Sequence, residues 1–322
     1  MGWKGTVRSI VAASRAAERE SQRRHRQQQK EQMTNESATA VADWENYVDD
    51  LVSIHTDMAD MIDWRTIATQ PRPNEPEEAT FHGDRAKAAL AGFKPRFFDI
   101  LKGGSAKLQE RLESELKHAS KRDKGDYRNQ LAAYRQALTE WEDDTSLARQ
   151  LLKGETAAIK QVIEELQSLT QNELIGSAIE FSIGNNFVHA RPKVHGDDIV
   201  PSVRRKQLAS GRLSETKMPI GQFNELYQDY VASVALKTGG DLFHILPLEE
   251  LYVTCEAYML DKHSGHNEWT AILSVQFVRD TFMRLNLANI DPSDSMRNFR
   301  HAMSFSKTKG FSSVEPLAPS TA

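Results

Sequence analysis

The chain has 322 residues, of which 39% are hydrophobic and 27% charged, and its formal net charge is −4 at pH 7. This mildly acidic balance argues against a protein that binds polyanions over its whole surface, but not against one local basic segment. Cys255 is the only cysteine, which excludes an intramolecular disulfide and a cysteine-rich zinc site. A lone cysteine fits a reducing compartment, and no apolar run approaches the roughly 20 residues that span a bilayer. We therefore expect a soluble, cytoplasmic protein without a cofactor.

Residues 1–32 predict a basic N-terminal helix with a short apolar face. The face consists of Trp3, Val7, Ile10 and Val11, and it gives way to glutamine and basic residues. Three roles stay open for this helix: a solvated helix, docking of the Trp3 end onto a partner, or attachment to an anionic membrane or nucleic acid. In the last two roles the contacts to a partner or to phosphate would come from Arg23, Arg24 and Arg26.

Residues 33–70 predict an amphipathic helix, which spans about 39–62. Its aromatic-rich stripe repeats every three or four residues and comprises Trp44, Tyr47, Leu51, Ile54, Met58 and Met61. Residues 71–103 form a corner, since three prolines break the helical pattern at Pro71, Pro73 and Pro76. A short helix over 79–91 follows, and then a hydrophobic plug made of Phe97, Phe98 and Leu101.

Residues 104–172 predict a long charged arm and one following helix. The arm, 104–152, contains no proline, and its apolar stripe has the 3.5-residue period of a coiled-coil seam: Tyr127, Leu131, Tyr134, Leu138, Trp141, Thr145, Ala148 and Leu152. A helix of this length is about 70 Å long and cannot bury such a stripe alone. We therefore expect partner helices from this chain or from another copy.

Residues 173–316 predict a small mixed α/β domain with an antiparallel sheet. A hairpin joins strands at 178–183 and 187–194, turning at Gly184-Asn185-Asn186. A helix over 203–209, an amphipathic helix over 219–240 that Gly239-Gly240 closes, strands over 251–259 and 271–278, and short helices near 279–285 and 292–301 follow. A tail from Pro316, with 317–322 as its own segment, is expected to be disordered. The fold class is thus α+β, with a coiled-coil-like helical half before the α/β domain.

Short distinctive motifs occur along nearly the whole chain. They include Asp63-Trp64, Lys94-Pro95-Arg96-Phe97-Phe98-Asp99, Trp141-Glu142, Ile179-Glu180-Phe181-Ser182-Ile183-Gly184, Val194-His195-Gly196, Met218-Pro219, Tyr227-Gln228-Asp229-Tyr230, Asp291-Pro292-Ser293-Asp294 and Lys307-Thr308-Lys309-Gly310-Phe311. With these motifs the chain resembles a family of uncharacterised bacterial proteins. The resemblance implies a bacterial, intracellular origin. It carries no activity and no site residues across to this chain.

The strongest catalytic candidates lie in the α/β domain and are Glu180, His189, His195 and Asp197. Histidine with carboxylates serves in acid–base chemistry or binds a divalent metal, although this spacing matches no established ligand pattern. A weaker metal candidate is the loop that carries His263, His266 and Glu268. In both places ordinary surface polarity is the commoner explanation, and Cys255 lies in an apolar strand that favours simple core packing.

Motifs of several large enzyme classes are missing from the sequence. It holds no Walker-type phosphate loop, no dinucleotide-binding glycine motif after a strand, no Gly-x-Ser-x-Gly elbow and no His-Glu-x-x-His zinc helix. Basic residues that suit a partner or phosphate do occur in the α/β domain, at Arg204, Arg205 and Lys206.

These patterns favour a non-enzymatic, oligomeric interaction or scaffold protein whose C-terminal domain recognises a partner. Self-association or another protein is the expected partner, and nucleic acid stays open. One alternative is an enzyme that processes nucleic acid or a phosphate ester with a histidine–carboxylate site. A second is tethering to nucleic acid or a membrane surface through the basic N-terminal helix.

Overall fold

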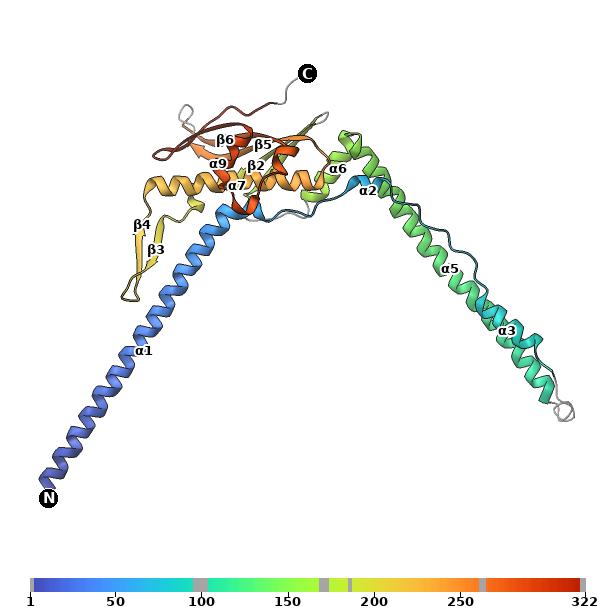
Figure 1. The fold of residues 1–322 in the computed structure, drawn as a ribbon, viewed down its shortest axis with the longest axis horizontal. Coiled ribbons are helices and arrows are strands. Elements are labelled where there is room, and N and C mark those ends of the chain that lie inside the picture. The colour runs from blue at the N-terminus through green and yellow to red at the C-terminus, as the bar shows by residue number, and fades with distance from the viewer. Residues whose placement is uncertain (1–2, 95–103, 168–173, 185–186, 261–264, 319–322) are drawn as a thin grey trace. The chain divides into compact units, whose positions relative to one another are not determined.

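The computed structural model describes residues 3–94, 104–167, 174–184, 187–260 and 265–318, with side chains described from residue 27 onward in the first helix and from residue 106 onward in the long arm. The chain forms two compact units. One joins Met1–Ile62 to Gly154–Ala322 and is called the sheet unit, and the other, Asp63–Lys153, is called the arm unit (Figure 1). This partition differs from the predicted boundaries, because the N-terminal residues share a unit with the C-terminal sheet.

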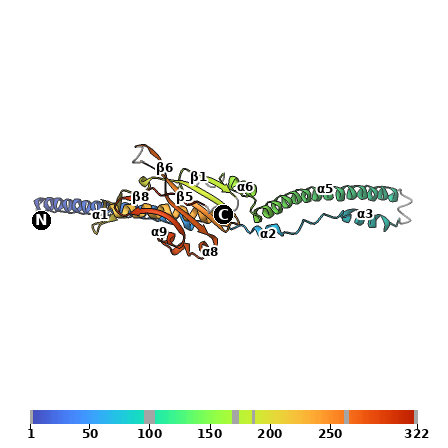
Figure 2. The same cartoon turned by 90° about the horizontal axis from the view of Figure 1, so that it is seen from above.

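The arm unit is organised by one long helix, α5 (Gly104–Leu152), as its period predicts. Its 49 residues give a length of about 73 Å. Two short helices, α2 (Trp64–Ala68) and α3 (Phe81–Ala91), and the extended residues between them lie along α5 (Figures 1 and 2). The predicted stripe is half-buried from Tyr127 to Trp141 and buried at Thr145 and Ala148. The stripe is therefore covered within its own unit from Tyr127 to Ala148, whereas its last member, Leu152, is 40% exposed.

The cover on α5 differs from the expected coiled-coil partner. The indole Nε1 of Trp141 donates to the carbonyl oxygen of Gln70 at 2.9 Å, which places the start of the proline-containing segment against the stripe. Proline at 71, 73 and 76 keeps this segment out of a helix, since it removes backbone donors and disfavours helical geometry in the preceding residue. The stripe is thus closed by short helices and an extended segment. The predicted plug of Phe97, Phe98 and Leu101 lies outside the described residues.

A buried carboxylate fixes α3 to α5. Asp123, 7% exposed, accepts hydrogen bonds from the backbone nitrogens of Gly83 at 2.6 Å and His82 at 3.1 Å. These are N–H groups of the first turn of α3, which have no partner inside the helix. Asp123 therefore caps α3 from a neighbouring helix and also places a negative charge at its positive end.

We expect Asp123→Ala to loosen α3. Loss of the cap leaves two N–H groups without their acceptor, at a cost of about 1–3 kcal/mol, so α3 amides should exchange with solvent roughly 5- to 150-fold faster. Asp126→Ala is the matched control, because Asp126 lies on the same helix with its side chain 54% exposed and 3.9 Å from Arg122. Hydrogen exchange measured by mass spectrometry compares the two. Equal α3 exchange in both variants would contradict the capping role.

The sheet unit is built on a six-stranded sheet of order β1-β2-β5-β6-β7-β8. Its strands are β1 (Ala178–Gly184), β2 (Phe187–Val194), β5 (Glu250–Leu260), β6 (Asn267–Val278), β7 (Arg300–Ser306) and β8 (Gly310–Ser312). Neighbouring strands are antiparallel, as predicted, except β2 and β5, which are parallel. The parallel pair needs a crossover, and helix α7 (Ile220–Ile245) supplies it.

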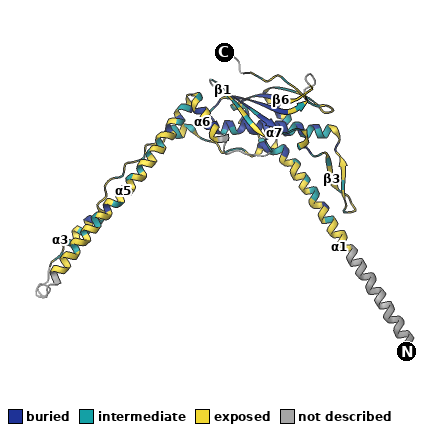
Figure 3. Ribbon diagram, turned by 180° about the vertical axis from the view of Figure 1, so that it is seen from behind, coloured by how far each residue is buried: buried dark blue, intermediate teal, exposed yellow. Residues whose placement is uncertain are grey.

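Helix α7 covers one face of this sheet and forms the core with it. Cys255 donates through Sγ to the carbonyl oxygen of Val231 on α7 at 3.6 Å, so odd-numbered residues of β5 point toward the helix. Figure 3 shows the central strands and α7 as the buried part of this unit. The helix does not end at Gly239 and Gly240, where its end was predicted, but continues to Ile245. The two glycines serve packing instead, because the Phe277 ring and the Met58 side chain occupy the space that side chains would take.

One continuous helix, α1 (Trp3–Ser53), replaces the two that the sequence predicts. A two-stranded hairpin packs on its second half: β3 (Val203–Gln207) and β4 (Leu213–Lys217). Ser37 donates to the Gly211 carbonyl at 2.8 Å, and the Trp44 indole donates to the Val203 carbonyl at 3.0 Å. The helix predicted over 203–209 was wrong. Its alternating Val203, Arg205 and Gln207 form a strand that faces α1.

Helix α1 ends earlier than expected because α7 binds the chain that follows. The 3-10 turn Ile54–Thr56 buries His55, whose Nδ1 contacts Ser233 Oγ at 2.8 Å. Lys237 then donates to the Asp57 carbonyl, and Asp241 accepts from the Ala59 nitrogen at 2.9 Å. These polar contacts hold residues 57–59 in a non-helical path along α7.

The remaining elements are short. They are α6 (Thr156–Gln167), α8 (Arg279–Phe282), α9 (Pro292–Ser295) and the 3-10 turns Asp197–Ile199, Leu287–Asn289 and Met296–Asn298. The predicted disordered tail needs correction at its start, because the Leu317 nitrogen donates to Ser274 Oγ at 2.9 Å and so holds this residue on the sheet. Asn185 and Asn186 of the predicted turn lie outside the described residues, although strands β1 and β2 pair as the hairpin requires.

Candidate functional site

The face of the sheet opposite α7, here called the open face, carries polar residues at alternate strand positions. Even-numbered residues of β5 point to it, and the strand register brings their partners on β2 and β6 to the same side. Several of these polar side chains are nevertheless buried: His189, Lys193, Thr254, Glu256 and Ser274. Buried polar groups must be hydrogen-bonded to be tolerated, so the contacts of these residues define what the face can do.

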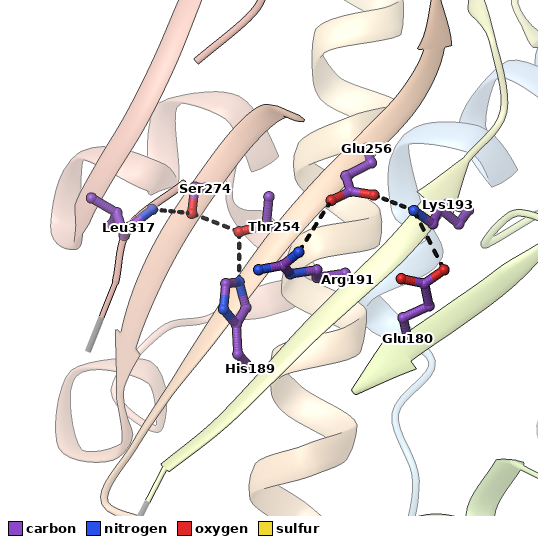
Figure 4. A network of polar contacts seen from close by, with 8 residues as sticks. All are labelled: Glu180, His189, Arg191, Lys193, Thr254, Glu256, Ser274 and Leu317. Carbon is purple, nitrogen blue, oxygen red and sulfur yellow. Dashed lines mark hydrogen bonds and ion pairs between the residues drawn. The ribbon is translucent and has the colours of Figure 1, made fainter. Parts of the chain in front are cut away.

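Three neutral side chains form a hydrogen-bonded chain across the strands (Figure 4). His189 Nε2 lies 2.7 Å from Thr254 Oγ1, which lies 2.7 Å from Ser274 Oγ. The backbone nitrogen of Leu317 can only donate, so Ser274 accepts from it. A direction that satisfies every group then runs from Leu317 through the Ser274 and Thr254 hydroxyls to an unprotonated Nε2 of His189.

The electrostatics of His189 agree with that direction. Burial, and then the positive charge of Arg191, lower the pKa of His189 from its ordinary 6.5 to about 4. The imidazole is therefore neutral at physiological pH and available as an acceptor.

Four charged residues form a second cluster on the open face (Figure 4). Lys193 is hydrogen-bonded to Glu256, lies 3.5 Å from a Glu180 oxygen, and sits 5.1 Å from the centre of the Trp269 ring. Arg191 Nη1 lies 3.9 Å from Glu256. Arg191 Nε is buried and has no hydrogen-bond partner among the described residues, while the side chain as a whole is 39% exposed. The cluster balances two cations with two carboxylates, and its solvent-exposed members are Arg191 and Glu180.

The structure separates the four predicted catalytic residues. Glu180 and His189 share the open face, but Glu180 pairs with Lys193 and His189 with Thr254. His195 lies beyond β2, where its backbone nitrogen donates to Tyr230 at 3.2 Å and its carbonyl accepts from Tyr227 at 2.8 Å. Asp197 is exposed in the following 3-10 turn. The expected His–carboxylate constellation is therefore not assembled among these four residues.

The other predicted sites have ordinary surface settings where they are described. His266 and Glu268 are exposed, His263 lies outside the described residues, and no metal-binding group of three His, Cys, Asp or Glu side chains occurs within the described ranges. Arg205 pairs with Glu215 at 2.9 Å, Arg204 contacts Gln222 at 3.2 Å, and Lys206 is exposed. The side chains of Arg23, Arg24 and Arg26 are outside the described part of α1.

Sequence reasoning missed most of the open-face network. The sequence does show alternation of polar and apolar residues in these strands. His189, Arg191 and Lys193 alternate with apolar residues or proline on β2, and Thr254 and Glu256 alternate with apolar residues on β5. Such a pattern predicts a strand with one polar face. Which residues of separate strands meet depends on the register between β2, β5 and β6, which a single sequence does not display.

Comparison with known proteins identified no similar protein. No family model, no curated protein and no solved structure matches the chain. Among the described residues, no helix has the length and apolar character needed to cross a bilayer.

We expect the sheet unit to lose stability in acid through His189. Above pH 6.5 the residue is neutral in both states and contributes no pH dependence, whereas below 6.5 the unfolded chain takes up the proton first. Stability is therefore lost as the pH falls from 6.5 toward 4, by about 2 kcal/mol at pH 5. Urea unfolding of wild type and His189→Gln between pH 7.5 and 5 measures this share. The same pH slope in both proteins would contradict it.

Proposed function

We propose that the chain is a non-enzymatic, oligomeric interaction or scaffold protein of a bacterial cytoplasm, in which the sheet unit recognises a partner. The observation that carries the proposal is the construction of the arm unit. Helix α5 covers its apolar stripe from Tyr127 to Ala148 with residues of its own unit and leaves charged side chains exposed along most of its length of about 73 Å. A rod of this kind, which needs no second chain to form, suits a scaffold that holds partner proteins apart or offers them a charged surface for docking.

The N-terminal helix supports the same role in a different way. From residue 27 onward, where its side chains are described, hydrogen bonds between α1 and the β3–β4 hairpin begin at Thr34, whose carbonyl accepts from Gln207, and at Ser37, which donates to the Gly211 carbonyl. Isolated helices are marginal in water unless an apolar face is packed. Residues 3–11 carry such a face in the sequence. Coiled-coil pairing of this end with a helix of another copy is therefore part of the proposal.

Self-association tests this account directly. We expect light scattering at micromolar concentration to give a mass above the 36.4 kDa of one chain. Val7→Glu with Ile10→Glu places two charges on the apolar face and should lower the mass toward one chain, because the buried seam is lost. Ser9→Glu with Ala12→Glu adds the same charge to the opposite side of the helix and should leave the mass unchanged. A wild-type chain that stays strictly monomeric contradicts self-association.

An enzyme that acts on nucleic acid or a phosphate ester remains the second candidate, and one observation favours it. Arg191 combines a buried Nε that lacks a described hydrogen-bond partner with a partly exposed side chain, beside the neutral acceptor His189. Such a guanidinium suits a phosphate oxygen. Turnover of a phosphate ester or single-stranded DNA that Arg191→Gln abolishes, while Asp197→Ala does not, would replace the scaffold proposal with this one.

Tethering through the basic end of α1 is the third candidate. Residues 1–30 carry eight Lys or Arg against two Glu, a formal charge of +6. Binding to anionic vesicles or DNA that falls with salt and disappears when Arg23, Arg24 and Arg26 become Glu would favour it.

A further inference from the structure

The chain's own C-terminal segment, residues 313–318, runs along β6 and reaches the open face of the sheet at Ser274. After β8, the Val314 nitrogen donates to the Ala271 carbonyl at 2.9 Å, and the Leu317 nitrogen donates to Ser274 Oγ at 2.9 Å. From the first bond to the second, the residue number rises by three in the segment and by three in β6, so the segment runs parallel to β6. Pairing between β6 and β7 involves residues 273–276, and the Ala271 carbonyl is thus left to the tail.

The composition of the tail suits this extended placement. Pro316 has no N–H and favours an extended residue before it, so donors remain at Val314 and Leu317 on either side of Glu315 and Pro316. Val314 and Leu317 are half-buried, whereas Glu315, Pro316 and Ala318 are exposed. The segment therefore presents two apolar side chains and two backbone donors to the sheet, three residues apart.

The tail also completes the hydrogen-bonded chain beneath it. Ser274 and Thr254 are fully buried and His189 is 4% exposed, and the Leu317 N–H is the donor at the end of their chain. Without that donor, Ser274 Oγ keeps its bond to Thr254 but has a free acceptor position. The open face thus offers a hydroxyl acceptor here, which the backbone N–H of any extended polypeptide can use.

We infer that the open face beside β6 is a docking site for an extended peptide segment of a partner protein, and that residues 314–317 occupy it until the partner displaces them. The partner segment carries apolar side chains three residues apart and an N–H at the second of them. This inference rests on the proposed interaction role and names the class of partner that the sheet unit recognises. Recognition is of the β-addition type, with backbone bonds for affinity and side-chain contacts for specificity.

The C-terminal segment is held weakly enough for a partner to displace it. It is held by two described hydrogen bonds and two half-buried side chains. Its covalent attachment nevertheless raises its local concentration to the order of millimolar. A free peptide therefore competes poorly with the intact tail and well with a tail that has lost its anchors.

A peptide-binding experiment on the full-length chain tests the inference. The probe is a fluorescein-labelled peptide with the sequence of residues 311–319, followed by anisotropy. We expect the Val314→Asp, Leu317→Asp chain, whose tail is released while its sheet is unchanged, to bind the probe at least tenfold more tightly than wild type. Adding Ser274→Ala to that chain should weaken binding roughly fivefold to tenfold, since the acceptor for the peptide N–H is lost.

The matched control is made on the probe, so that it does not depend on the folding of any variant. Methylation of the Leu317 nitrogen removes one donor and keeps the side chain, and it should reduce binding to the released chain. The same methylation at Ala318 should not. No binding to the released chain, or equal binding of both methylated probes, would overturn the inference.

Light scattering distinguishes a second occupant and a failure of the scaffold proposal. If wild type self-associates and the Val314→Asp, Leu317→Asp chain does not, the site belongs to the tail of a second copy and the partner-peptide form is overturned. If instead wild type is monomeric but the released chain binds the probe, self-association fails while the docking site stands.

Discussion

The structure of the sheet unit depends on the burial of both faces of its central sheet, one of them apolar and the other polar. One face is apolar and buried by α7, as the contact from Cys255 to Val231 shows. The other holds His189, Lys193, Thr254, Glu256 and Ser274, which are all buried and must find partners without a covering helix. Cross-strand contacts satisfy most of these groups, and the C-terminal segment supplies the last donor at Ser274.

The charged residues of the open-face cluster, two cations and two carboxylates, pair with one another. Lys193 contacts Glu256 and Glu180 at once, and Arg191 shares Glu256. A buried pair of this kind adds little net stability, because desolvation offsets much of its attraction, but removal of one member leaves a buried charge.

Long-range periodicity made the helices predictable, and the distant contacts were not. The stripe from Tyr127 to Ala148 in the sequence is the covered side of α5, whereas the helix expected before Pro71 already ends at Ser53, where α7 binds the chain that follows. The identity of the cover was missed, because Asp123 capping α3 and Trp141 binding Gln70 are contacts between residues 40 or more positions apart. Likewise, α1 continues through residues 33–38 because helical bonding needs no apolar stripe there.

The candidate site was predictable only by residue type. Glu180 and His189 were singled out and do lie on one face, but Lys193, Thr254 and Glu256 join them through strand pairing that one sequence does not encode visibly. His195 and Asp197 were grouped with them by proximity in the chain. The structure places them past the end of β2, where His195 is bonded through its backbone to α7.

The central claim is that the open face holds an extended backbone and can exchange it. Hydrogen exchange of individual amides by NMR measures this most directly, at Val314 and Leu317. The account predicts that both amides are protected in the free protein, and that a tail-sequence peptide removes their protection only at concentrations well above the roughly millimolar local concentration of the attached tail, while the amides of β6 stay protected. Exchange of both amides at the rate of an unstructured chain, with or without the peptide, would contradict it.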